Sequence, residues 1–190
     1  MPSGKSRSSA GGSGGILKFF LGFVFAFVVL FVGAWIYLKF GNPPVAVADH
    51  ALPFEREIVR IPMHARVDRE TQQPPFGISE DVYETGAMAY KLQCASCHGV
   101  PGQEVAFGKQ MYPHAPQLWK KHAHGNGNVV GVSDDPPGET FWKVKNGIRL
   151  SGMPAFKGIL TDDQMWDVSL LLQHANEQLP DPVVGMLKGK

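Results

Sequence analysis

Cysteine is nearly absent from this chain. Cys94 and Cys97 are the only cysteines among 190 residues, and both lie in the stretch LQCASCHGV. A single pair excludes a framework of several disulfides and also a four-thiolate zinc site. A strong net charge is missing too, because the formal net charge is +1 at pH 7 and residues 79–190 hold ten Lys/Arg against twelve Asp/Glu. We therefore expect no nucleic-acid partner.

Charged residues are missing altogether from Phe19 to Leu38, a run of twenty residues rich in Phe and Val. As a helix this run spans roughly 30 Å, which matches the core of a bilayer. Residues 16–40 are therefore expected to form a single transmembrane anchor. The alternative is a signal peptide cleaved after Ala48, because AVA at 46–48 is a small-residue cleavage pattern.

The flanks of the anchor predict its orientation. Lys5, Arg7 and Lys18 come before the apolar core, so the N-terminus is expected inside and the rest of the chain on the periplasmic side of the cytoplasmic (inner) membrane. The Gly/Ser-rich residues 1–15 are expected to be a disordered cytoplasmic N-terminus.

Proline marks the next region. Residues 41–78 contain NPP and QQPP and are expected to form a Pro-containing periplasmic spacer, because each proline disfavours a helix at its own position and at the preceding one. The segment EREIVR at 55–60 fits either a strand or a turn of helix. The apolar Ile58 and Ile61 also leave open a spacer that docks on the following domain.

Helix start signals begin at Ser79, which suits an N-cap with Glu80 and Asp81 in the first turn. This helix should run into the cysteines. A short helix is expected over 139–147 and a last one from the N-cap Thr161 toward Pro180, with a flexible loop over 124–138 and a C-terminal tail over 181–190.

The cysteine pair is followed directly by His98, which gives the pattern C-x-x-C-H. Cysteines three residues apart on a helical turn can form thioethers with the two vinyl groups of one haem, and the adjacent imidazole then points at the iron. Zinc, disulfide and dithiol sites fit less well, because neither a second ligand pair nor a preceding strand is evident. The pattern predicts one covalent haem c per chain.

His98 would fill only one axial position of the iron. An electron carrier fills the opposite position, most often with Met or His from farther along the chain, whereas an O₂-binding or catalytic haem keeps it open. Met153 stands out, because Gly152 permits close backbone approach and Pro154 fixes the chain after it, whereas Met165 fits a helix core. The candidates are Met111, His114, His122, His124, Met153, Met165, His174 and Met186.

Three segments, CASCHG, GIRLSGMPAF and LTDDQMWDVSLLLQ, make residues 79–180 resemble the bacterial class I (monohaem) c-type cytochromes. The resemblance implies an all-α class I cytochrome c fold, three to five helices around one haem, here preceded by a single N-terminal transmembrane helix. It implies that Cys94 and Cys97 bind the cofactor and that His98 and Met153 ligate the metal.

The same resemblance implies the roles of several other residues. Gly86 and Tyr90 would lie where the first and last helices cross, against Trp166 and Leu170 or Leu171. The carbonyl of Pro113 or Pro116 would accept a hydrogen bond from His98, and Trp142 would contact a haem propionate.

The expected function follows from this resemblance: a membrane-tethered electron carrier, not an enzyme, serving the respiratory or photosynthetic chain. Its partners would be membrane electron-transfer complexes: a quinol-cytochrome c reductase, a terminal oxidase, a reaction centre or a dehydrogenase. The alternatives are a permanent haem c subunit of a larger membrane oxidoreductase and, more remotely, a haem sensor or peroxidase with an open iron position.

Overall fold

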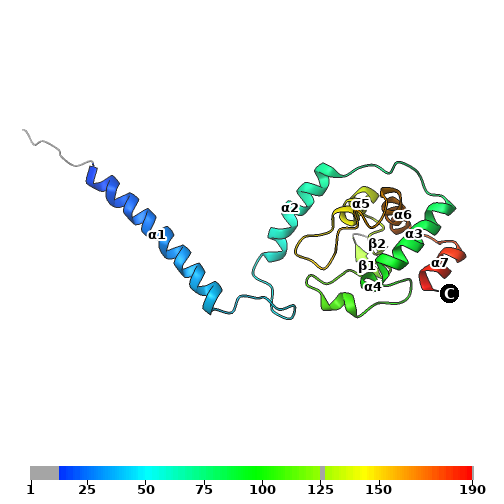
Figure 1. The fold of residues 1–190 in the computed structure, drawn as a ribbon, viewed down its shortest axis with the longest axis horizontal. Coiled ribbons are helices and arrows are strands. Elements are labelled where there is room, and N and C mark those ends of the chain that lie inside the picture. The colour runs from blue at the N-terminus through cyan, green and yellow to red at the C-terminus, as the bar shows by residue number, and fades with distance from the viewer. Residues whose placement is uncertain (1–12, 125–126, 190) are drawn as a thin grey trace, which may run out of the picture. The chain divides into compact units, whose positions relative to one another are not determined.

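The computed structural model describes residues 13–124 and 127–189, and the chain divides into two units with a boundary after His50. Figure 1 gives the order of the elements along the chain. The first unit contains the helix α1, Ser13–Phe40. The second contains the helices α2 to α7, one 3₁₀ turn and a two-stranded hairpin, so the fold is all-α apart from that hairpin.

Helix α1 is long and apolar enough to cross a membrane, and the side chains described along it are exposed. It begins at Ser13, so residues 13–15, expected in the disordered N-terminus, belong to the helix. Glycine disfavours a helix by only about 1 kcal/mol per residue, so Gly14 and Gly15 do not end a helix that the apolar run continues. The expectation for residues 1–12 lies outside the described residues.

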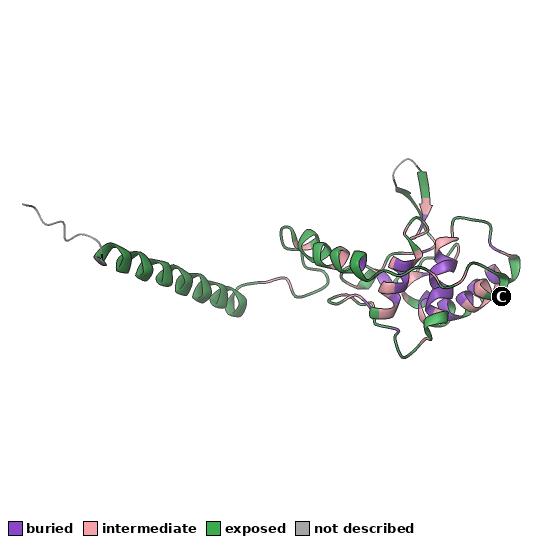
Figure 2. Ribbon diagram, turned by 90° about the horizontal axis from the view of Figure 1, so that it is seen from above, coloured by how far each residue is buried: buried purple, intermediate pink, exposed green. Residues whose placement is uncertain are grey.

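Helices α3, Glu80–Gln93, and α6, Asp162–Gln173, form the centre of the second unit. Their starts are where the sequence places them. The Ser79 hydroxyl accepts from Val82 N at 3.3 Å, and Thr161 and Gln164 form a reciprocal capping box. Figure 2 shows the buried residues concentrated on these packed helices.

Gly86 permits the close approach of α3 to α6. A Cβ at this position would lie 2.6 Å from the Asp167 carbonyl oxygen and 3.3 Å from the Leu171 Cβ. The expected crossing is therefore present, with Leu171 as one partner. Trp166, the other expected partner, stacks on Phe141 at 3.9 Å between ring centroids, and its contact with α3 stays a prediction.

Phe141 belongs to α5, Pro137–Asn146, and forms a second apolar cluster with Trp166, Met165 and Phe156. Met165 is fully buried, as its position on a helix face predicts. This cluster attaches α5 to α6 and so fixes one wall of the site described below.

Residues 41–78 are not an irregular spacer throughout, because Glu55–Glu70 forms the 16-residue helix α2, with Pro62 inside it. An internal proline costs a helix about 3 kcal/mol. Packing on the domain opposes this cost, since Val67 is 2% exposed and Glu70 Oε2 accepts from Trp142 Nε1 at 2.8 Å.

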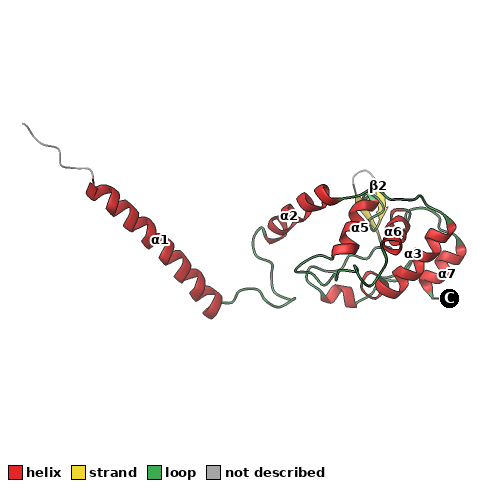
Figure 3. Ribbon diagram, turned by 45° about the horizontal axis from the view of Figure 1, so that its top comes forward, coloured by secondary structure: helices red, strands yellow, loops and turns green. Residues whose placement is uncertain are grey.

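Two further expectations for loops are wrong. Within the predicted loop 124–138 lies the strand β2, Gly127–Val130, which pairs antiparallel with β1, Lys121–His124, and Figure 3 shows the two short strands among the helices. The predicted tail contains helix α7, Asp181–Lys188, whose Val183 and Leu187 are fully buried. Burial of these two side chains against α3 explains why so short a helix forms.

Candidate haem site

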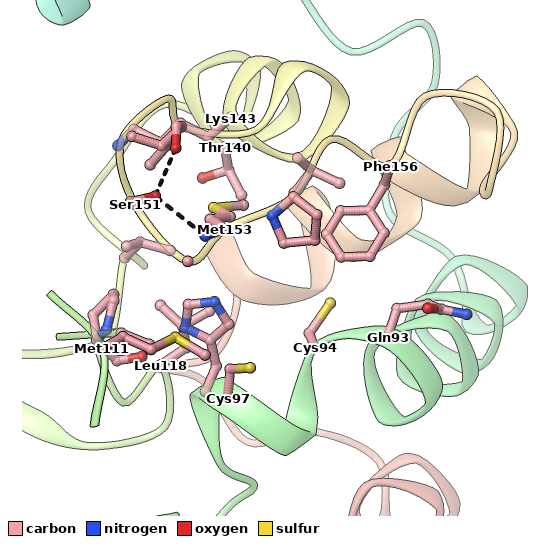
Figure 4. Close-up of a pocket in the computed structure, with 18 of the residues that line it drawn as sticks. Gln93, Cys94, Cys97, Met111, Leu118, Thr140, Lys143, Ser151, Met153 and Phe156 are labelled. Atoms are coloured by element: carbon pink, nitrogen blue, oxygen red, sulfur yellow. Dashed lines mark hydrogen bonds between the residues drawn. The ribbon is translucent and has the colours of Figure 1, made fainter. Parts of the chain in front are cut away.

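A cavity of about 230 Å³ lies between α3, α5, α6 and the loop after α5. Its lining includes Cys94, Cys97, His98 and Met153, the four residues singled out from the sequence. In Figure 4, Met153 lies across the cavity from the helical turn that carries the cysteines, and both thiols point into the space between. The walls are mostly apolar; Leu118, Val144, Phe156, Val168 and Leu172 belong to them.

The cysteines lie where α3 ends and the four-residue helix α4, Ala95–His98, begins. Backbone hydrogen bonds from Cys97 N and His98 N both end on the Cys94 carbonyl, at 3.1 and 2.9 Å. The turn is closed on its far side by Tyr90, whose buried hydroxyl donates to the Gly99 carbonyl at 2.8 Å. This tight turn presents two thiols and one imidazole to the same space.

Burial affects the thiols differently. Cys94 is 8% exposed, and desolvation, with a smaller contribution from the nearby Cys97, raises its pKa to about 12. Cys97 is only partly buried. Both cysteines are free thiols, so no disulfide competes for their sulfur atoms.

His98 is oriented by its backbone neighbours. Its Nδ1 lies 2.7 Å from the Pro116 carbonyl oxygen, so Nδ1 is the protonated nitrogen and Nε2 keeps its lone pair. Burial lowers the pKa of this imidazole, and the Pro116 carbonyl opposes that shift. Of the two prolines considered from the sequence, the structure therefore identifies Pro116.

The segment around Pro116 is tied to the cysteine turn by residues that the sequence did not reveal. Gln117 donates to the Cys97 carbonyl at 3.1 Å and accepts from Val105 N at 2.9 Å. Leu118 N donates to the His98 carbonyl at 3.1 Å. A lone glutamine in a loop carries no pattern that distinguishes it from a solvated one, so only the fold shows this bridge.

Met153 is held by a compact loop. Its N–H donates to Ser151 Oγ at 3.2 Å, Ser151 Oγ donates to the Ile148 carbonyl at 2.7 Å, and Ile148 N donates to the Met153 carbonyl at 3.2 Å. Gly147 starts the loop at φ 67°, and a Cβ there would lie 2.7 Å from Ala155 N. The loop thus presents the thioether from a fixed backbone.

Two other methionines also line the cavity. Met111 packs against the Met153 loop, since a Cβ on Gly152 would lie 2.5 Å from its Sδ. Met63 comes from α2, a residue that sequence reasoning missed because its helix was not predicted. Of the other candidates, His114 is at the lining, and the described side chains of His122, Met165, His174 and Met186 are not; the His124 side chain is outside the described residues.

Trp142 lies outside the lining of the cavity, and its contact with a haem propionate stays a prediction. Its indole N–H is used by Glu70, the guanidinium of Arg66 lies 5.7 Å from its ring centroid, and it is not among the described lining residues. The polar groups that reach the cavity include Thr140 and Lys143, and Lys143 Nζ lies 2.6 Å from Glu139 Oε1.

The residues present fit a covalently held haem. The donor set consists of two unpaired thiols three residues apart, an imidazole with its Nε2 free and a thioether on the opposite side. Apolar walls surround these groups. Metal-binding clusters of His, Cys, Asp and Glu do not occur within residues 13–124 and 127–189, so this mixed donor set differs from a zinc or calcium site.

Residues 81–170, a little under half of the chain, match the family model described as "Cytochrome C oxidase, cbb3-type, subunit III". The solved structures include a similar chain in the "Kuenenia stuttgartiensis reducing HAO-like protein complex Kustc0457/Kustc0458", at 18% identity and a TM-score of 0.35. The alignment covers 74% of this chain and 54% of that one, so the chain spans about half the length of that relative. No curated protein matches the sequence.

Proposed function

Residues 81–170 form a c-type cytochrome domain that binds haem c covalently, and from this premise we propose that the chain is a membrane-tethered carrier of single electrons. Cys94 and Cys97 would hold the haem through thioethers, and His98 and Met153 would ligate its iron. The observation that carries the proposal is that all four side chains line one apolar cavity, with the methionine facing the cysteine turn.

The haem supplies a one-electron Fe(III)/Fe(II) couple when bound. The chain's residues tune that couple. The Pro116 carbonyl fixes the His98 tautomer and makes its imidazole a stronger donor. Met153 would supply a soft sulfur that favours the ferrous state, and the apolar walls would disfavour the additional charge of the ferric state.

Helix α1 supports a tether to the membrane, and the basic residues before its core support an N-terminus inside the cytoplasmic membrane with the haem domain on the periplasmic side. The free linker is shorter than residues 41–78, because α2 packs on the domain. Residues 41–54 remain, and at about 3.3 Å per residue they reach at most roughly 46 Å. Donor and acceptor would therefore be membrane complexes close to the bilayer, and a quinol-oxidising complex and a terminal oxidase are the pair we propose.

A permanent subunit of a larger oxidoreductase is the second candidate. The matching family, described as an oxidase subunit, and the short free linker both favour this candidate. The basic side chains near the domain surface give little steering charge, because Lys109 and Lys120 pair with Glu104, and Lys145 with Asp162. Purification from native membranes separates the two roles: a fixed stoichiometry with an oxidase indicates a subunit, and a protein that purifies alone indicates a carrier.

The axial ligand is tested with matched variants of the three cavity methionines, Met63→Leu, Met111→Leu and Met153→Leu. Leucine keeps the volume and removes the sulfur. We expect only Met153→Leu to lose the weak far-red charge-transfer band of the oxidised protein and to bind carbon monoxide when reduced.

The other two variants serve as controls for packing around the same cavity. Loss of the band in Met111→Leu instead would transfer the ligand role to Met111. Carbon monoxide binding by the unmodified protein would refute the closed His/Met site and favour a sensor or peroxidase.

A further inference from the structure

Helix α2 has apolar residues on two opposite faces. On one face Met63 lines the haem cavity, Val67 is 2% exposed, and Glu70 bonds to Trp142. On the other face Ile58 and Ile61 are 65% and 70% exposed. The second face is not needed to attach the helix to the domain.

The exposed residues form a continuous stripe. Ile58, Ile61 and Ala65 are all exposed, and the spacings of three and four residues place them on one side of the helix. Phe54, the N-cap residue at φ 61°, comes directly before the helix and adds a fourth apolar side chain that is 74% exposed. At about 100° per residue, Ile61 lies roughly 200° around the helix from Met63. Exposed apolar residues that line up in this way mark a contact surface.

The chain itself indicates what covers this stripe. Residues 41–54 link it to the end of α1, so the stripe cannot move farther from the bilayer than that linker allows. The linker continues the apolar character, since Val45, Val47 and Leu52 are all exposed. Four arginines and four carboxylates balance along α2, which suits an uncharged apolar surface more than a strongly charged partner.

We infer that the stripe Phe54, Ile58, Ile61 and Ala65 lies in the headgroup–acyl boundary of the bilayer that holds α1. This inference rests on the membrane tether of the proposed function. With its inner face packed on the domain, α2 offers only the outer face to lipid, and an apolar helix face at the interface is buried about 5–10 Å. Because the charges along α2 balance, we expect the stripe to insert to the same depth in neutral and in anionic lipid.

The consequence concerns the direction in which the haem domain faces. α2 is attached to the domain through Val67, Glu70 and Met63, so seating α2 also orients the domain. The bilayer and the haem cavity then lie on opposite sides of one helix. Electron-transfer partners would approach the domain from sides other than the outer face of α2.

Spin labels on the haem-loaded full-length chain test this seating. Cys94 and Cys97 are the only native cysteines and are consumed by the haem, so an introduced cysteine is the single reactive thiol. Labels are placed by Ile61→Cys on the stripe, by Arg56→Cys on the same helix off the stripe, and by Ile159→Cys, an exposed apolar position on the domain. The protein is reconstituted at one copy per nanodisc, in phosphatidylcholine with and without phosphatidylglycerol.

At Ile61 we expect collisions with a water-soluble relaxation agent to fall at least about threefold relative to Arg56 and Ile159, and collisions with oxygen to rise, in both lipid mixtures. Equal accessibility at all three positions would overturn the inference. Protection that requires two copies per disc would overturn it in favour of a self-association surface.

A fourth label, at Phe27→Cys in α1, separates this result from the tether. If the label at Phe27 is embedded in the bilayer and the label at Ile61 is exposed to water, the tether is supported and the insertion of the α2 stripe is refuted. A water-exposed label at Phe27 refutes the membrane tether and the seating with it.

Discussion

The contact between α3 and α6 at Gly86 predicts the sign of a single substitution. Alanine in place of glycine inside a helix normally stabilises a protein by about 1 kcal/mol. At Gly86 the new Cβ would lie 2.6 Å from the carbonyl oxygen and 2.8 Å from the carbonyl carbon of Asp167, both backbone atoms that no rotamer change can move. Overpacking of a rigid contact costs about 1–3 kcal/mol, and a backbone clash belongs at the upper end. Gly86→Ala should therefore lower the free energy of unfolding by about 1–2 kcal/mol.

The assay is guanidinium unfolding of the haem-loaded protein in detergent, followed by far-UV circular dichroism. Gly77→Ala is the matched control, because a Cβ there meets nothing within 4 Å, and its unfolding midpoint should stay the same or rise slightly. The α3–α6 contact also shapes the cavity, since Val168 and Leu172 of α6 line it, so the Soret band of Gly86→Ala should shift. A Gly86→Ala protein as stable as the unmodified one would show that this contact does not set the helix separation.

Three other outcomes are expected. Burial, with a smaller contribution from Asp163, raises the pKa of Asp167 to about 6. The folded protein therefore binds this proton more tightly than the unfolded chain does, and the free energy of unfolding should fall as pH rises from about 4 through 6. Asp167→Asn should remove that pH dependence and raise the free energy of unfolding at pH 7 by on the order of 1–3 kcal/mol, as measured by unfolding at several pH values. Trp142→Phe leaves the Glu70 carboxylate without its indole partner and should speed proteolysis within α2, read by limited digestion, with no change in the far-red band. Tyr90→Phe removes the buried hydrogen bond to the Gly99 carbonyl and should cost about 1–2 kcal/mol of unfolding free energy.

The parts of the fold that the sequence predicts are those determined by local chemistry. Ser79 and Thr161 cap their helices with their own side chains. The C-x-x-C-H turn encodes its function within five residues, so the covalent haem follows from spacing alone. Each of these signals acts over a few residues and needs no knowledge of the rest of the chain.

The parts that the sequence does not predict depend on partners far away along the chain. α2 contains Pro62, and its bond to Trp142 joins residues 72 positions apart. α7 has eight residues, too few for a stable isolated helix, and Lys91 donates to the Leu187 carbonyl across 96 positions. Local helix propensity opposes or barely favours both helices, so long-range packing determines whether they form.

The same long-range packing bears on how electrons pass through this protein. A carrier on a free spacer of residues 41–78 would rotate in all directions, and its haem would meet each partner by diffusion. Because α2 is attached to the domain, the domain can rotate relative to α1 only through bonds in residues 41–54. Part of this linker is itself ordered, since the Asp49 carboxylate accepts hydrogen bonds from Val45 N and Ala46 N, both at 2.8 Å. A shorter tether raises the effective concentration at nearby membrane complexes and excludes distant ones. Under the proposed function, the chain would therefore suit exchange between neighbouring complexes, or within one, better than transport across the periplasm.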